Sequence, residues 1–100
     1  MDYHIIPEPE PEPAYAVPFV VERETARGMY RLINVGHEAI HGVALTLHGA
    51  GLMAANAPAR LECLEVLEVS VAGRDLARNS IMVVRWFRPD GIEYLWRVNF

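Results

Sequence analysis

The residues His37-Glu38-Ala39-Ile40-His41 are the stretch of this 100-residue chain whose types and spacing could do chemistry. They fit the pattern H-E-x-x-H, in which two histidines hold a zinc ion and the glutamate polarises a bound water for peptide hydrolysis. This chemistry requires a helix, because a helix places side chains four positions apart on one face, where both imidazoles reach one metal. The motif must therefore be tested against the element that carries it.

The sequence around the motif favours a loop followed by a strand. Gly36 precedes the motif, Gly42 follows it directly, and the stretch after Gly42 alternates apolar and polar residues with period two. In an extended strand His37 and His41 would lie roughly 13 Å apart, too far to share a metal. The longer metzincin pattern, with a glycine and a third histidine downstream, is not met. We therefore expect no catalytic residue, metal or cofactor, and a zinc metallopeptidase is the alternative function.

Composition and charge limit the remaining functions. The chain carries a formal net charge of −4 and no lysine, and four of its 13 acidic residues lie in the first thirteen positions. The rest of the chain is neutral, so nothing favours binding to nucleic acid. No apolar run approaches the ~20 residues of a membrane span, and the acidic, proline-rich start is unlike a secretory signal. The lone Cys63 suits a reducing compartment, and we expect a buried thiol in a cytoplasmic protein.

Residues 1–13 form a separate region of the sequence. Residues 7–13 read PEPEPEP, and such alternating prolines exclude a helix or a central strand. We expect a stiff polyproline II arm of roughly 20 Å, followed by one domain over residues 14–100. The arm is interpreted as a solubilising or spacing tail. As an alternative it docks on a partner protein through Tyr3, Ile5 and Ile6.

The domain reads as short strands separated by turns, which is typical of a β-sandwich. The expected strands cover residues 14–25, 29–35, 40–49, 64–71, 79–88 and 91–100. Pro18 places the first strand at a sheet edge, because proline cannot donate to a central ladder. Asn34, Val35 and Gly36 are expected to turn the chain. Residues 48–59 and 72–79 are expected to be loops, and the first of these is a further candidate contact site.

The last two strands predict a hairpin with a definite register. Pro89, Asp90 and Gly91 form a three-residue loop, in which proline presets the first turn angle and glycine takes the left-handed one. Partner residues then sum to 180. One face receives the pairs Trp86–Tyr94, Val84–Trp96 and Met82–Val98. The other face receives Arg85–Leu95, Phe87–Glu93 and Val83–Arg97.

The aromatic face of this hairpin has two interpretations. Trp86, Tyr94 and Trp96 are expected to form the core, because large aromatic residues dominate small β-sheet cores. A carbohydrate-binding surface is the alternative. The opposite face is more apolar than a solvated sheet requires, so it is expected to be covered by the N-terminal segment or to contact a partner. The candidate contact residues on it are Arg85, Phe87, Leu95 and Arg97.

At YRLINVGHEAIHGVALTL and LEVLEVSV the chain resembles bacterial immunoglobulin-like and fibronectin-III-like sandwiches. Its arginine-only, Ala/Val/Leu-rich composition and the ending VVRWFRPDGIEYLWRVNF look like those of small proteins from GC-rich bacteria. This resemblance implies an all-β fold, a seven-stranded antiparallel immunoglobulin-like sandwich with the proline-rich arm in front. It also implies a non-catalytic interaction or structural module, for example an accessory subunit of a larger assembly. Its partner would be another protein or a second copy of the chain.

Overall fold

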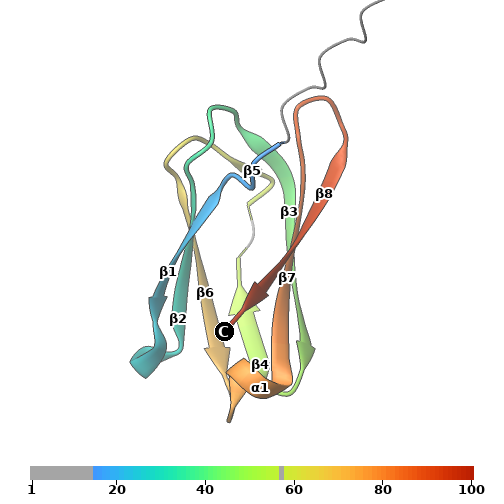
Figure 1. The fold of residues 1–100 in the computed structure, drawn as a ribbon. Helices are drawn as coiled ribbons and strands as arrows, with labels where there is room; N and C mark the ends of the chain where they lie inside the picture. Colours follow the sequence, from blue (N-terminus) through green and yellow to red (C-terminus); the bar gives the residue numbers. More distant parts are fainter. Residues whose placement is uncertain (1–14, 57) are drawn as a thin grey trace, which may run out of the picture.

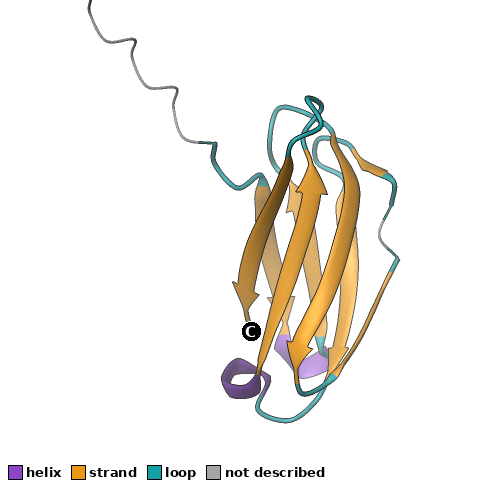
Figure 2. Cartoon of the chain, turned by 90° about the vertical axis from the view of Figure 1, so that its right-hand side faces the viewer, coloured by secondary structure: helices purple, strands orange, loops and turns teal. Residues whose placement is uncertain are grey.

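A computed structural model describes residues 15–56 and 58–100. Its strands form two antiparallel four-stranded sheets packed face to face (Figure 1). Sheet A has the strand order β1 (Phe19–Glu24), β2 (Met29–Asn34), β6 (Val66–Ala72), β4 (Leu52–Ala55). Sheet B has the order β5 (Arg60–Leu61), β3 (Ile40–Gly49), β7 (Ser80–Phe87), β8 (Glu93–Asn99). The 3₁₀ turn η1 (Thr25–Arg27) and the helix α1 (Leu76–Asn79) lie at one end of the sandwich (Figure 2).

The expected all-β architecture of two antiparallel sheets is confirmed, but the expected number of seven strands is wrong. The described residues contain eight strands, and the short helix α1 lies in the segment 72–79 that was expected to be a loop. The two strands that lie outside the six expected ranges are both short. β4 lies inside the segment 48–59, and β5 follows it directly. The expected arm over residues 1–13 lies outside the described residues.

Strand β4 forms because the chain crosses from sheet B to sheet A over two glycines. Gly49 and Gly51 have φ values of 103° and 113°, which residues with a side chain rarely adopt. A Cβ at Gly49 would collide with the carbonyl of Asn79, so the backbones approach too closely there for any other residue. The chain then runs antiparallel to β6, and Leu52 pairs with Ala72. Pairing with an existing strand, rather than local β propensity, makes this segment a strand.

The hairpin of β7 and β8 has the predicted register. Trp86 pairs with Tyr94 and Arg85 with Leu95, so partner residues sum to 180 as expected. The loop closes with the Arg88 N–H donating to the Ile92 carbonyl at 3.0 Å and the Gly91 N–H donating to the Arg88 carbonyl at 2.8 Å. Gly91 has a φ of 84°, the left-handed angle that the sequence assigned to it.

The core lies between the two sheets and contains the aromatic face of the hairpin. Trp86 is 1% exposed and packs edge-on against Phe19, with ring centroids 5.1 Å apart. Tyr94 and Trp96 are half-buried against the same cluster. The predicted core position is thus confirmed for Trp86, and Tyr94 and Trp96 pack against the core with part of their surface exposed. No helix in the described part of the chain is long and apolar enough to cross a membrane.

Candidate interaction surfaces

The H-E-x-x-H stretch has the expected loop-and-strand conformation. His37 and Glu38 lie in the loop after β2, and His41 is the second residue of β3. The two histidines therefore do not share a helix face, which is the geometry that a zinc peptidase of this pattern requires. Within residues 15–56 and 58–100, no group of three His, Cys, Asp or Glu side chains is arranged to hold a metal ion.

Glu38 instead belongs to a cluster that joins three segments of the chain. The Nε of Arg88 donates to its Oε1 at 2.7 Å, and both side chains are about one-third exposed, at 30% and 33%. The Arg88 guanidinium also lies 4.2 Å from the centroid of the Tyr15 ring, a cation–π distance. The hydrogen bond with Glu38 raises the pKa of Arg88 above its usual value. The cluster holds the segment before β1 against the β7–β8 hairpin.

Tyr15 connects this cluster to the core. Its hydroxyl accepts a hydrogen bond from the Nε1 of the buried Trp86 at 3.2 Å, and its ring lies 4.6 Å from that of Tyr94. Burial raises the pKa of Tyr15 above its usual value of 10.0, and the negative charge of Glu38 acts in the same direction. The Trp86 hydrogen bond and Arg88 act against this shift. The hydroxyl therefore keeps its proton more firmly in the folded state than in the unfolded chain.

The buried Asn34 fixes the turn predicted at residues 34–36. Its Nδ2 donates to the carbonyls of Glu38 at 3.1 Å and Leu61 at 3.0 Å, and its Oδ1 accepts the Gly36 N–H at 3.0 Å. Asn34 is fully buried, with 0% exposure, and these bonds use both the Nδ2 donor and the Oδ1 acceptor of its side-chain amide. Since Leu61 lies in sheet B, the Asn34 side chain ties the two sheets together at this end of the molecule.

Cys63 differs from the expectation of a buried thiol, because the structure places it on the surface. It lies in the turn between β5 and β6, where the backbone reverses outside the core. The next residue, Leu64, has a φ of 66° and is 70% exposed. A leucine in the left-handed region is uncommon, because its Cβ crowds the backbone there. This turn therefore presents a large apolar side chain to solvent in a conformation that carries strain.

The predicted contact residues of the hairpin lie together on the outer face of sheet B. Arg85 and Phe87 lie on β7, and Leu95 and Arg97 lie on β8. Leu95 is 58% exposed and Phe87 is 37% exposed, so both are available to a partner. Arg85 is engaged with Glu93 at 2.6 Å on the same face. The structure thus brings together these four predicted residues, whereas Tyr3, Ile5 and Ile6 lie outside the described residues.

A second exposed apolar surface, on the outer face of sheet A, was not predicted from the sequence. Val20 pairs with Ile33, and Ile33 pairs with Val66, so the three residues form one row across three strands. We call these residues the apolar row. Val20 and Val66 are 47% and 46% exposed. Leu64 lies near the row, since its N–H donates to the carbonyl of Asn34, the neighbour of Ile33.

A row of charged residues borders the apolar row. Arg31 lies between Glu22 and Glu68 in the strand register, and its guanidinium contacts their carboxylates at 4.0 Å and 3.4 Å. An apolar centre with a charged rim is the usual arrangement of a protein contact surface. The sequence contains a pattern for this surface. Val20 lies two positions from Glu22, and Val66 two positions from Glu68, so each pair lies on one side of its strand. That pattern could be read only once the pairing of the strands was known.

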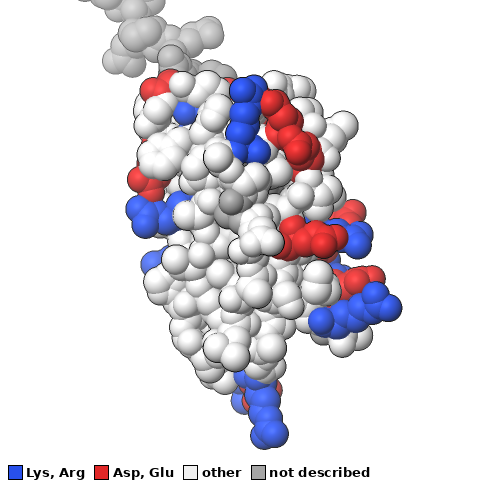
Figure 3. Space-filling model, turned by 180° about the vertical axis from the view of Figure 1, so that it is seen from behind, with Lys and Arg blue, Asp and Glu red and all other residues white. Residues whose placement is uncertain are grey.

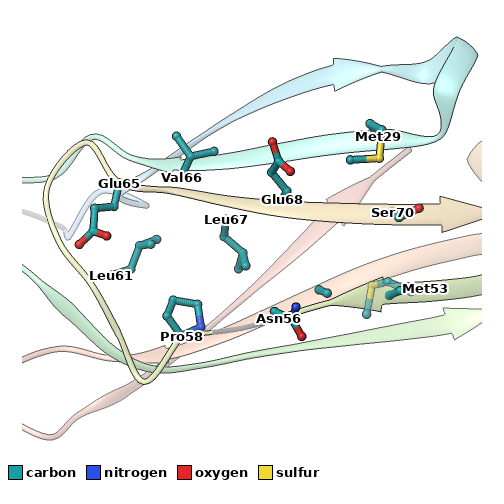
Figure 4. A pocket seen from close by; sticks show the side chains of 12 residues that line it. Met29, Met53, Asn56, Pro58, Leu61, Glu65, Val66, Leu67, Glu68 and Ser70 are labelled. Carbon is teal, nitrogen blue, oxygen red and sulfur yellow. The ribbon is translucent and has the colours of Figure 1, made fainter.

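A groove of about 790 Å³ runs beside β6, where β4 ends (Figure 4). Met53, Pro58, Leu61 and Leu67 contribute its apolar lining, and Glu65 and Glu68 also line it. On the face opposite to that of Figure 1, the centre of the lower half is uncharged, and charged side chains lie along its right edge and at its tip (Figure 3). The segment 48–59, a candidate contact loop in the sequence, therefore contributes β4 and part of this groove.

Comparisons with protein-family models, with curated proteins and with solved structures find no match. The features of the molecule that bear on function are the exposed apolar surface on each sheet and the loop-and-strand conformation of the H-E-x-x-H stretch.

Proposed function

We propose that the chain is a non-catalytic interaction module with an immunoglobulin-like topology. The strand order supports this topology, because β1-β2-β6-β4 facing β3-β7-β8 corresponds to the strands A-B-E-D facing C-F-G of a constant-type immunoglobulin domain. In this correspondence β5 is an additional short strand beside β3. Sandwiches of this kind carry their functions on exposed faces, edges and loops, so the function must be argued from the surfaces.

The apolar row on sheet A carries the proposal. Val20, Ile33 and Val66 lie in register on three strands, and the exposed Leu64 extends the surface. Side chains at these positions gain about 25 cal/mol for each Å² of apolar surface that a partner covers. The chain keeps apolar residues here although the outer positions next to them along the same strands are charged. Binding of another protein explains why these positions remain apolar.

The surroundings of Glu38 support the non-catalytic part of the proposal. A metallopeptidase glutamate must reach a metal-bound water, but Glu38 is hydrogen-bonded to Arg88 at 2.7 Å. We place the protein in the cytoplasm, where the exposed, unpaired Cys63 stays reduced. The partner is a protein with an apolar contact surface and a charged rim, and the module serves as an accessory subunit of the assembly that contains it.

Site-specific photo-crosslinking in cells of the source organism tests this function. A photoreactive phenylalanine analogue replaces Val66, and the matched control places the same analogue at Ser70. Both positions are exposed and lie on the outer side of β6, but Ser70 is outside the apolar row. We expect one discrete crosslinked product from position 66 and much less of it from position 70. Equal labelling at both positions, or no product from either, would contradict the proposal.

A shortened chain separates the apolar row from the N-terminal arm as the binding element. The crosslinking at position 66 is repeated with residues 1–13 removed. Unchanged yield of the same product supports binding through the apolar row and rejects a docking arm. Complete loss of the product assigns the contact to the arm, through Tyr3, Ile5 and Ile6, and overturns the surface proposed here.

A further inference from the structure

Strand β8 is an edge strand of sheet B, with β7 on one side and no strand on the other within the described part of the chain. The hydrogen bonds of the hairpin define which backbone groups it exposes. Arg88 and Ile92 are hydrogen-bonded partners, and in antiparallel strands such pairs alternate with pairs whose N–H and C=O groups point away. The groups of Glu93, Leu95, Arg97 and Asn99 therefore point away from β7. Arg23 reaches the Asn99 carbonyl from that outer side, at 3.0 Å.

The side chains of this exposed edge are complementary to themselves. Glu93, Leu95 and Arg97 alternate with residues that face the core, so all three lie on the outer face of sheet B. An antiparallel second β8 with its two-fold axis at Leu95 places Glu93 opposite Arg97 twice. It also places the two Leu95 side chains, each 58% exposed, opposite each other. In this register opposite charges face each other at Glu93 and Arg97, and apolar side chains face each other at Leu95.

We propose that a second copy of this chain pairs with β8 in an antiparallel manner, with the two-fold axis at Leu95. The two sheets B then form one continuous eight-stranded sheet across the dimer. The outward N–H and C=O groups of Glu93, Leu95 and Arg97 gain backbone partners, as in strand addition to an exposed edge. A two-fold contact of this kind closes on itself and stops at the dimer.

The charges already present on the strand fit this arrangement. Arg97 takes part in none of the ion pairs between described residues. Glu93 uses Oε1 for Arg85, at 2.6 Å, and a carboxylate has further acceptor sites on its second oxygen. Glu93 can therefore keep Arg85 and also accept Arg97 of the second copy. Opposite charges across paired strands are favourable, and like charges are unfavourable by similar amounts.

The other edge strands fit a second copy less well. β1, the edge strand of sheet A next to β2, has Val20, Glu22 and Glu24 on its outer side. Self-pairing about Glu22 would bring two carboxylates together. β4 and β5 are short, with four and two residues. β8, with seven residues and a balanced outer face, is the best edge for pairing.

Two charge-reversal variants test the proposal in the full chain. Arg97→Glu places Glu opposite Glu in a homodimer, and Glu93→Arg places Arg opposite Arg. Both positions are exposed, so the fold of each variant is retained. Sedimentation equilibrium over roughly 1 µM to 1 mM is expected to show a wild-type dimer, with each variant alone dissociating at least about tenfold more readily. An equimolar mixture of the two variants restores complementary pairs and the dimer. A monomeric wild type, or variants that dimerise unchanged, overturns the proposal.

A disulfide test checks the register, in chains where Cys63→Ser removes the native thiol. In Leu95→Cys the two new thiols lie opposite each other, with Cα atoms about 5.5 Å apart, a distance that a disulfide can bridge. In the control Arg97→Cys each thiol faces Glu93 of the second copy and lies roughly 13 Å from its equivalent. We expect crosslinked dimer from Leu95→Cys alone under mild oxidation. Faster crosslinking of Arg97→Cys contradicts this register. Neither outcome depends on the apolar row of sheet A, so the proposed function is tested separately.

Discussion

The Nε of Arg88 donates to the Oε1 of Glu38 at 2.7 Å, across fifty positions of sequence. The contact places the glutamate of the H-E-x-x-H stretch in a structural ion pair beneath the β7–β8 hairpin. Glu38 thus contacts the hairpin loop, and His41 lies within strand β3. A five-residue pattern with three fixed positions gains its meaning from the element that carries it.

Replacing Glu38 with Gln is expected to lower the free energy of unfolding by about 0.5–1 kcal/mol, because the charge-assisted bond to Arg88 becomes a neutral one and the pair is partly exposed to solvent. Urea unfolding followed by tryptophan fluorescence measures the change. Glu62→Gln is a control, since its partner Arg60 is more exposed, at 58%. A Glu38→Gln variant as stable as wild type would show that the pair contributes nothing.

Zinc is expected to have no effect on the stability of the chain. His37 lies in a loop and His41 in a strand, so the two side chains lack the shared helix face of a zinc peptidase. Protein purified without a histidine tag should hold no zinc after dialysis, and its thermal midpoint should not change when zinc is added. One zinc per chain, lost in His41→Ala, would instead support a metallopeptidase.

Tyr15 predicts a loss of stability at alkaline pH. Its pKa is raised in the folded state, mainly by burial, so its contribution is fully present below the unfolded pKa near 10.0. It is lost as the pH rises through the higher folded value. Tyr15→Phe should therefore flatten the decrease in unfolding free energy above pH 10. It should also cost about 1 kcal/mol at neutral pH, because the Nε1 of Trp86 loses its acceptor. Denaturant unfolding at a series of pH values compares the two slopes, and equal slopes would contradict the assignment.

Asn34→Ala is expected to destabilise the fold by about 2–4 kcal/mol, because it leaves the buried carbonyl of Leu61 and the partly buried backbone groups of Glu38 and Gly36 without their side-chain partner. Thermal and urea unfolding measure this loss. The control Asn99→Ala alters an exposed side chain and should stay within about 0.5 kcal/mol of wild type. If the two variants behave alike, Asn34 does not hold the sheets together.

Leu64→Asn should raise the unfolding free energy by about 0.5–1 kcal/mol, since asparagine tolerates the left-handed angle better than leucine. If Leu64 belongs to the contact surface, the same variant should reduce the crosslinked product formed at position 66. Leu52→Asn is the matched control, because Leu52 is 78% exposed and is not among the residues with positive φ. Unchanged crosslinking in Leu64→Asn would separate this residue from the surface.

The parts of the fold that could be predicted are those fixed by local chemistry. The sequence Pro89-Asp90-Gly91 determines a turn, and the turn sets the register of β7 and β8. The alternation of Leu67, Val69 and Val71 likewise predicts β6 and its buried side. The loop conformation at His37 also follows from nearby residues, namely Gly36 and Gly42 on the two sides of the stretch.

The remaining features depend on partners far away in the sequence. β4 and β5 are strands only because β6 and β3 offer them hydrogen bonds, since half of the residues of β4 are alanine and β5 has only two residues. The apolar row exists only after β1, β2 and β6 are aligned. Asn34 could be predicted to turn the chain, but its bond to Leu61 spans two sheets and has no local sequence pattern.

The contacts between the two sheets differ in kind between the two ends of the sandwich. Near Asn34 the bond to the Leu61 carbonyl crosses the interface, and the Arg88–Glu38 bond holds the adjoining loop. At the far end Tyr30 and Phe100 make an apolar ring contact, and the exposed Arg23 donates a hydrogen bond to the Asn99 carbonyl of β8. Directional bonds resist shear, whereas apolar contacts tolerate sliding. The two sheets should therefore separate more easily near Phe100 than near Asn34.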